Sequence, residues 1–105
     1  MSTKDLEIAK RIAGIEGVEL LKNGVKSLLH KNNDGNMTVD GVQYAIYNPF
    51  NWEVLGPLMV KHKAKVCYRF KEVVIYTKKL PVNTYFSNET ETPRAILECI
   101  IKSKE

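Results

Sequence analysis

The sequence predicts an α+β fold, in which a small antiparallel sheet packs with three helices in an α/β/α sandwich-like arrangement. Three segments, near residues 2–17, 51–62 and 92–104, space their apolar side chains as amphipathic helices do. Short β-branched or alternating runs lie between them, separated by turn signals such as Asn23-Gly24 and Asp40-Gly41. A length of 105 residues fits one domain, residues 1–105.

The first helix is predicted from a capping signal and a broad apolar face. Ser2 is a suitable N-cap, and Asp5 follows at the spacing of a capping box. Leu6, Ile8 and the apolar residues that follow at helical spacing form one face. Gly17 is expected to end the helix.

Four short β segments are expected next. They are Val18–Leu21, Val25–His30, Met37–Val39 and Val42–Ile46. Asn23-Gly24 and Asp40-Gly41 provide turns, and residues 32–36 form the most polar loop of the chain.

The second helix follows a turn at Asn48-Pro49, because proline moves Asn48 away from helical backbone angles. Asn51 is a good N-cap for this helix. Pro57 removes one backbone hydrogen bond within the helix, so we expect a kink or a regular helix that starts near Pro57.

The remaining segments predict a hairpin, an edge strand and a last helix. Residues 63–70 and 73–77 read as strands joined at Lys71-Glu72. Residues 80–87 are ambiguous, because Pro81 excludes a central strand whereas Val82, Thr84 and Phe86 could alternate along the edge of a sheet. Thr92 is predicted to cap the last helix, with Pro93 at its first position.

Composition and charge bound the class of protein. The chain contains sixteen Lys and Arg residues and twelve Asp and Glu residues, and its three arginines are Arg11, Arg69 and Arg94. This weakly basic, lysine-rich balance permits polyanion binding without requiring it. Cys67 and Cys99 lie in apolar runs and read as buried free thiols. We find no signal-peptide pattern and no membrane span, so we expect a soluble, cytoplasmic protein.

Five segments together resemble small phage and prophage proteins of the "phage ABA sandwich" type. They are Leu6–Ala13, Glu16–Val18, Tyr47–Pro49, Gly56–His62 and Thr92–Ile96. The resemblance covers about half of the chain, and its specificity comes from the order of the motifs. It implies an α/β/α fold and a phage or prophage origin. That family is largely without assigned activity, so it implies no catalytic residue.

An aromatic turn is the candidate binding site. Tyr44, Tyr47, Phe50 and Trp52 surround Asn48-Pro49. One interpretation is a core anchor, in which Phe50 and Trp52 fix the turn to the sheet. The other is a stacking platform for a planar ligand, with polar and basic partners for its edge and its phosphate. The candidate ligand-binding residues are Asn48, Phe50, Asn51, Trp52, Lys61, Arg69 and Arg94.

A second pattern places lysines and tyrosines in alternation. Lysines recur at 63, 65, 71, 78 and 79, with Tyr68, Tyr76 and Tyr85 among them. They form either a solvated strand face or a stripe that tracks the phosphates of a nucleic acid.

We predict no metal site, no cofactor and no catalytic residue. His30, His62 and the two cysteines lack the spacing of metal ligands. The favoured hypothesis is a non-enzymatic accessory protein that binds a host protein or a nucleotide-like small molecule, for instance in counter-defence. The alternatives are a small nucleic-acid-binding protein and a small enzyme using Cys67, His62 or His30. A homodimer could form through the edge at residues 81–86.

Overall fold

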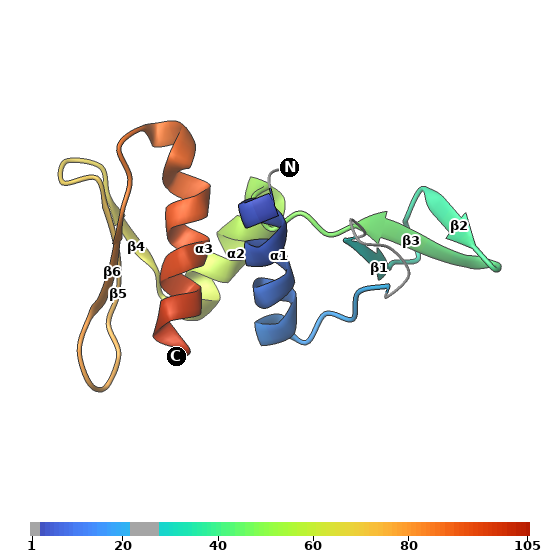
Figure 1. Ribbon diagram of the computed structural model, residues 1–105, viewed down its shortest axis with the longest axis horizontal. Coiled ribbons are helices and arrows are strands. Elements are labelled where there is room, and N and C mark those ends of the chain that lie inside the picture. The colour runs from blue at the N-terminus through green and yellow to red at the C-terminus, as the bar shows by residue number, and fades with distance from the viewer. Residues whose placement is uncertain (1–2, 22–27) are drawn as a thin grey trace. The chain divides into compact units, whose positions relative to one another are not determined.

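The computed structural model describes residues 3–21 and 28–105, and these residues form three α-helices and two three-stranded antiparallel sheets (Figure 1). The α+β class is confirmed. The strands divide between two sheets, whereas we expected one. Strands that precede the second helix pair with each other, and so do those that follow it, because short connections favour pairing between sequence neighbours.

The chain divides into two units, Met1–Asn48 and Pro49–Glu105. The first unit holds helix α1 (Thr3–Glu16), whose buried residues are Ile8, Ala9, Ile12 and Ala13. Gly17 ends the helix as predicted, with a φ of 69° that favours glycine. The predicted Ser2 cap and the Asn23-Gly24 turn lie outside the described residues.

The sheet of the first unit has the order β1-β3-β2, with β1 (Leu29–Lys31), β2 (Met37–Val39) and β3 (Val42–Ile46). The last two strands are confirmed at their predicted bounds. Asp40 and Gly41, with φ of 51° and 79°, join them in a turn with two left-handed residues. The strand predicted at 18–21 is wrong, since only Leu20 forms an isolated bridge, to His30.

The start of β1 and the loop that follows it also differ in how well they were predicted. The predicted strand 25–30 is seen only in part, because Leu29 and His30 belong to β1 and residues 25–27 lie outside the described residues. Gly35 leaves no room for a side chain, because a Cβ atom there would overlap the carbonyl group of Tyr44. The loop that joins β1 to β2 therefore needs glycine at this point.

The second unit begins with α2 (Trp52–His62), and the predicted N-cap at Asn51 is confirmed. Asn51 is the N-cap: its side chain accepts from the backbone nitrogen of Glu53 at 3.2 Å, and its carbonyl oxygen from Val54 and Leu55 at 2.9 and 2.8 Å. These bonds start the helix before Pro57, which lies inside it. Of the two alternatives, a regular helix that begins near Pro57 is therefore wrong.

The second sheet has the order β4-β5-β6, with β4 (Lys65–Cys67), β5 (Glu72–Ile75) and β6 (Val82–Tyr85). The antiparallel hairpin and the edge position of β6 are confirmed. The first of these strands is shorter than predicted, because the chain turns at residues 68–71, where Lys71 has a φ of 51°.

Helix α3 (Thr92–Ser103) covers one face of this sheet through β5 and β6, and α2 packs against α3. A 3-10 turn, η1 (Glu89–Glu91), leads into it and is capped by the side chain of Asn88. Thr92 is consequently the first helical residue, with φ and ψ of −55° and −46°, and not the predicted cap. Pro93 is therefore the second helical residue, one position later than predicted, and still lies in the first turn, where proline is tolerated.

Candidate nucleic-acid interface

The second sheet has one buried face and one exposed face. Val73, Ile75 and Thr84 are buried on the side of α3. Because side chains alternate along a strand, their neighbours point the other way. We call this second side the outer sheet face. It consists of Lys65, Cys67, Glu72, Val74, Tyr76, Asn83 and Tyr85.

Two tyrosines dominate the outer sheet face. The side chain of Tyr76 is 68% exposed and that of Tyr85 is 70% exposed. Tyr85 is the cross-strand partner of Glu72, and Tyr76 lies four residues after Glu72. The two tyrosines are therefore separated by about 14 Å along the strand direction. That spacing leaves room for a separate planar group on each ring.

Polar contacts tie the strands of this face together. The Nζ atom of Lys65 lies 5.5 Å from the centre of the Tyr76 ring, within the range of a cation–π interaction. The amide nitrogen of Asn83 donates a hydrogen bond of 2.9 Å to Glu72. Glu72 is the one acidic residue of the outer sheet face, so the other charge on that face is the positive charge of Lys65.

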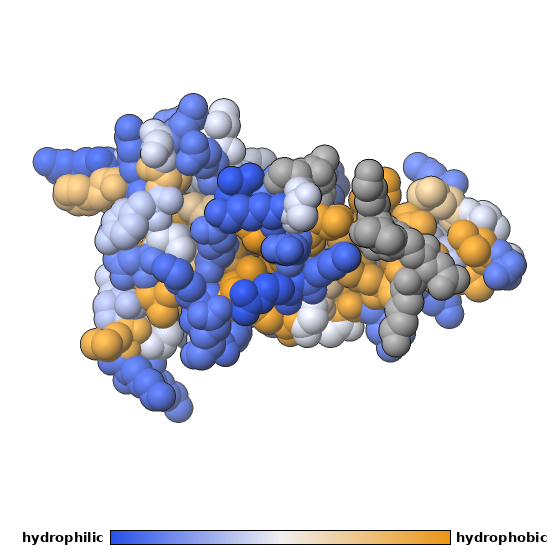
Figure 2. All heavy atoms as spheres, in the orientation of Figure 1, coloured by the Kyte–Doolittle hydropathy of each residue, from blue (hydrophilic) through white to orange (hydrophobic). Residues whose placement is uncertain are grey.

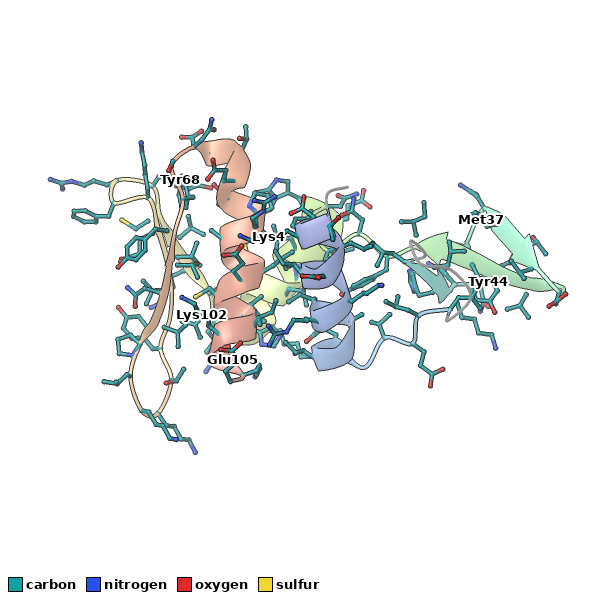
Figure 3. All side chains as sticks on the ribbon, viewed as in Figure 1. Lys4, Met37, Tyr44, Tyr68, Lys102 and Glu105 are labelled. Carbon is teal, nitrogen blue, oxygen red and sulfur yellow. The ribbon has the colours of Figure 1, made fainter. Side chains whose placement is uncertain are left out.

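The turn at residues 68–71 adds aromatic and basic side chains at one end of the sheet. Lys71 donates from Nζ to the carbonyl oxygen of Ser87 at 3.2 Å, and its own carbonyl oxygen accepts from the Phe86 nitrogen at 3.0 Å. Tyr68, labelled in Figure 3, meets the ring of Phe86 edge-on at 6.1 Å. These contacts hold the turn against the connection to α3 and leave Arg69 exposed beside Phe70.

The loop between β5 and β6 carries basic side chains at the other end. Thr77 organises it, since its Oγ1 donates to the Leu80 carbonyl oxygen at 2.6 Å and accepts from the nitrogens of Lys79 and Leu80 at 3.3 Å. Lys78 and Lys79 are exposed on this loop. Figure 2 shows hydrophilic side chains projecting at both ends of the sheet.

Charge is concentrated around this sheet. The sequence from Lys61 to Lys79 contains seven exposed Lys and Arg residues and one acidic residue, which gives a net charge of +6. The first unit contains six basic and six acidic residues, and the second contains ten and six. The whole net charge of +4 therefore belongs to the second unit.

The aromatic turn proposed from the sequence has a different character. Tyr47 and Pro49 are buried, whereas Trp52 is 53% exposed, so of the two interpretations the core anchor does not hold for Trp52. Phe50 and Asn48 are half-buried. Trp52 is the first residue of α2, and the buried residues of this helix, Leu55 and Leu58, follow later along it.

The basic residues assigned to that turn lie on separate elements. Lys61 is nine residues beyond Trp52, about 14 Å away along the axis of α2. Arg69 lies in the turn after β4, and the half-buried Arg94 lies in the first turn of α3. Asn51 is on the exposed side of the turn, with its side-chain oxygen used in capping. Of the lysines and tyrosines singled out in the sequence, three lie on the outer sheet face: Lys65, Tyr76 and Tyr85. The others lie in the turns and loops around the sheet, namely Lys63, Tyr68, Lys71, Lys78 and Lys79. Glu72 and Asn83 were missed, although strand alternation could have placed them on this face.

The two cysteines differ in their surroundings. Cys67 is half-buried on the outer sheet face, so the prediction that it is buried is wrong. Cys99 is buried as predicted, and burial is the main cause that raises the pKa of its thiol. Within residues 3–21 and 28–105, no three His, Cys, Asp or Glu side chains are grouped as metal ligands. No helix in the same described ranges has the length and apolar character needed to cross a membrane.

Comparison with known proteins gives no match: no family model fits the chain, and neither a curated protein nor a solved structure resembles it significantly. The fold and the outer sheet face define a small α+β protein that presents two exposed tyrosines on a sheet surrounded by basic turns. The outer sheet face is therefore the candidate binding surface.

Proposed function

We propose that the protein binds single-stranded nucleic acid on the outer sheet face. The observation that carries this proposal is the exposure of Tyr76 and Tyr85 on one sheet surface within the most basic segment of the chain. Aromatic side chains on a flat surface stack with unpaired bases, and lysines beside them neutralise phosphates. This is the alternative function that the sequence suggested.

Single strands fit this surface better than a duplex does. Stacking on a tyrosine ring needs a base whose face is open, and the bases of a duplex are stacked on each other. Each stacked base contributes about 1–3 kcal/mol, independently of its identity. Reading of base edges relies mainly on bidentate arginine, and the segment from Lys61 to Lys79 has six lysines and one arginine. Binding should therefore depend little on sequence.

The test is fluorescence anisotropy with a labelled oligothymidine and with a duplex, at several salt concentrations. Phosphate neutralisation predicts a slope of log affinity against log salt of about −0.7 per phosphate contact on a single strand. The double variant Lys78→Gln/Lys79→Gln should make that slope shallower by about 1.4. A matched double variant, Lys10→Gln/Lys104→Gln, removes two exposed charges outside the sheet and should leave the slope nearly unchanged.

The proposal fails if single strands are not bound even at low salt, or if both double variants reduce the slope equally. A preference for the duplex would also contradict the single-strand assignment, since stacked pairs offer no open base to the tyrosines.

A second candidate is the accessory role that the phage resemblance implies, in which a host protein or a nucleotide-like molecule binds near the aromatic turn. One observation favours it: the half-exposed indole of Trp52 next to Asn51 offers a stacking surface. A thermal-shift screen of mononucleotides with wild type and Trp52→Leu tests the small ligand, and capture from a host lysate tests the protein partner. No shift and no capture would remove this candidate.

A further inference from the structure

The sheet of the first unit has an exposed face made of apolar side chains. Register pairs Leu29 with Ile46, Met37 with Tyr44 and Val39 with Val42, and strand alternation puts all six side chains on the same side. Figure 3 labels Met37 and Tyr44, which come from the neighbouring strands β2 and β3. We call this surface, made of Leu29, Met37, Val39, Val42, Tyr44 and Ile46, the apolar sheet face.

The apolar sheet face is partly exposed, because Met37, Val39 and Ile46 are exposed whereas Leu29, Val42 and Tyr44 are half-buried. Ile46 is 65% exposed, Met37 45% and Val39 39%, and hydrophobic atoms are visible over these strands in Figure 2. The opposite side carries more polar residues, among them His30 and Gln43. A sheet of three short strands gains its stability from covering an apolar face. Single exposed apolar side chains are ordinary, whereas apolar side chains that lie side by side on one sheet face form a surface that a partner can cover.

We propose that the partner is a second copy of this chain, which packs its own apolar sheet face against the first. The distribution of charge favours this occupant. The first unit has no net charge, whereas the second carries +4, so two copies repel each other least when they meet through their first units. A surface that meets its own copy around a two-fold axis is the commonest interface in homo-oligomers.

The charge on the face itself agrees with self-association. Lys31 is the one charged residue in these strands that lies on the side of the apolar sheet face, because it is the cross-strand partner of Tyr44. It belongs to β1, which is an outer strand of the sheet. Its long side chain can reach solvent from the border while its stem covers apolar surface. Two such faces can meet without burying a like-charged pair at their centre.

The size of the face sets the expected affinity. Three strands about 4.8 Å apart, the longest of five residues at about 3.4 Å each, cover roughly 240 Å² in projection. A standard interface buries about 800 Å² per partner. The dimer should therefore be weak and reversible, with a dissociation constant in the range of tens of micromolar or above. Strand pairing between two copies along the edge of β2 would add little contact area, because that strand has three residues.

Sedimentation velocity without nucleic acid, from about 5 µM to about 500 µM protein, tests this proposal across the expected dissociation constant. The wild type should shift from monomer to dimer over that range. Ile46→Lys puts a charge into the apolar sheet face and should weaken association at least about tenfold. Gln43→Lys is the matched control, because Gln43 is exposed on the same strand with its side chain on the other side.

A protein that stays monomeric over the whole range, or a Gln43→Lys variant as impaired as Ile46→Lys, overturns the proposal. Circular dichroism verifies that the variants are folded. Should Ile46→Lys be unfolded, Met37→Gln/Val39→Thr, two milder changes in the exposed strand β2, takes its place under the same criteria. Raised salt should leave the dimer intact, because an apolar interface is not screened, and this separates it from the charge-dependent binding of nucleic acid.

Discussion

The ammonium group of Lys65 lies 5.5 Å from the centre of the Tyr76 ring, and both side chains belong to the outer sheet face. Lys65 starts β4, and Tyr76 directly follows β5. This contact holds the ring next to a positive charge, where a stacked base would bring its phosphate. The pair thus links the stacking and electrostatic parts of the proposed binding surface.

Replacement of the tyrosines should reduce binding through loss of stacking. Tyr76→Leu and Tyr85→Leu are each expected to cost about 1–3 kcal/mol of binding free energy, which is roughly 5- to 160-fold in affinity for oligothymidine. Anisotropy titrations at one low salt concentration give these values. Both side chains are about two-thirds exposed, so their loss should hardly change the free energy of unfolding.

Phenylalanine variants are the controls for this prediction. Tyr76→Phe and Tyr85→Phe keep the ring and remove only the hydroxyl group, so they should bind within about twofold of the wild type. If leucine variants bind as well as phenylalanine variants, the rings do not stack with bases and the surface works by charge alone.

Glu72 should oppose binding, because it is the acidic residue of the outer sheet face and the cross-strand partner of Tyr85. Glu72→Gln removes this charge, and the new side-chain oxygen can still accept the hydrogen bond from Asn83. We expect tighter binding by about two- to fivefold at low salt and a smaller gain at high salt. Glu7→Gln, the same change at an exposed position of α1, should have a smaller effect. Weaker binding of Glu72→Gln would show that the carboxylate itself contacts the ligand.

The sequence predicted correctly those elements that begin and end at residues with a local structural preference, such as the residues of a tight turn. The turn at Asp40-Gly41 and the strands beside it are examples, since two left-handed residues define a tight hairpin by themselves. The α+β class followed from the same kind of pattern. Lys65, Tyr76 and Tyr85 of the outer sheet face were also singled out, because the interleaving of lysines and tyrosines is visible in the sequence.

Features that depend on packing were missed. The exposure of Trp52 depends on which side of α2 is buried, and apolar spacing in its first turn did not decide that. Thr92 carries a cap signal, but the capped 3-10 turn at Glu89–Glu91 shifts the start of α3. The separation of strands into two sheets depends on pairing between segments, which residue spacing alone did not reveal.

Two buried threonines should respond in opposite ways to the same substitution. The hydroxyl of Thr92 is buried and has no hydrogen-bond partner, whereas that of Thr84 donates to the Ala95 carbonyl oxygen at 2.6 Å. Thr→Val keeps the shape and removes the hydroxyl. Thr92→Val should leave the free energy of unfolding unchanged or raise it by up to about 1 kcal/mol, since an unsatisfied group is removed. Thr84→Val should lower it by about 1–2 kcal/mol, because the bond to Ala95 is lost.

Urea denaturation followed by circular dichroism gives both values from the transition midpoints. Each variant serves as the control for the other, because the atoms exchanged are identical. A loss of stability in Thr92→Val comparable to that in Thr84→Val would mean that the Thr92 hydroxyl has a partner in solution.

The two thiols should differ in reactivity and in their dependence on pH. Thiolate is the reactive form, and burial raises the pKa of the Cys99 thiol, which lies 3.3 Å from the Val82 carbonyl oxygen. Ellman's reagent at pH 8 should therefore modify one thiol quickly, that of the half-buried Cys67, and the second only in denaturant. Cys67→Ser should abolish the fast phase, and a fast phase that persists would contradict the burial of Cys99.

The raised pKa of Cys99 determines the direction in which the free energy of unfolding changes with pH. The folded protein holds the thiol proton more tightly than the unfolded chain, so the contribution to stability is complete below the ordinary pKa of 9.0 and declines as the pH rises above it. The difference in free energy of unfolding between wild type and Cys99→Ala should thus shrink between pH 8 and pH 10. Urea titrations at both pH values measure it, and comparison with the alanine variant cancels the titration of lysines and tyrosines. A difference that is constant or grows with pH would mean that the folded protein does not disfavour the thiolate.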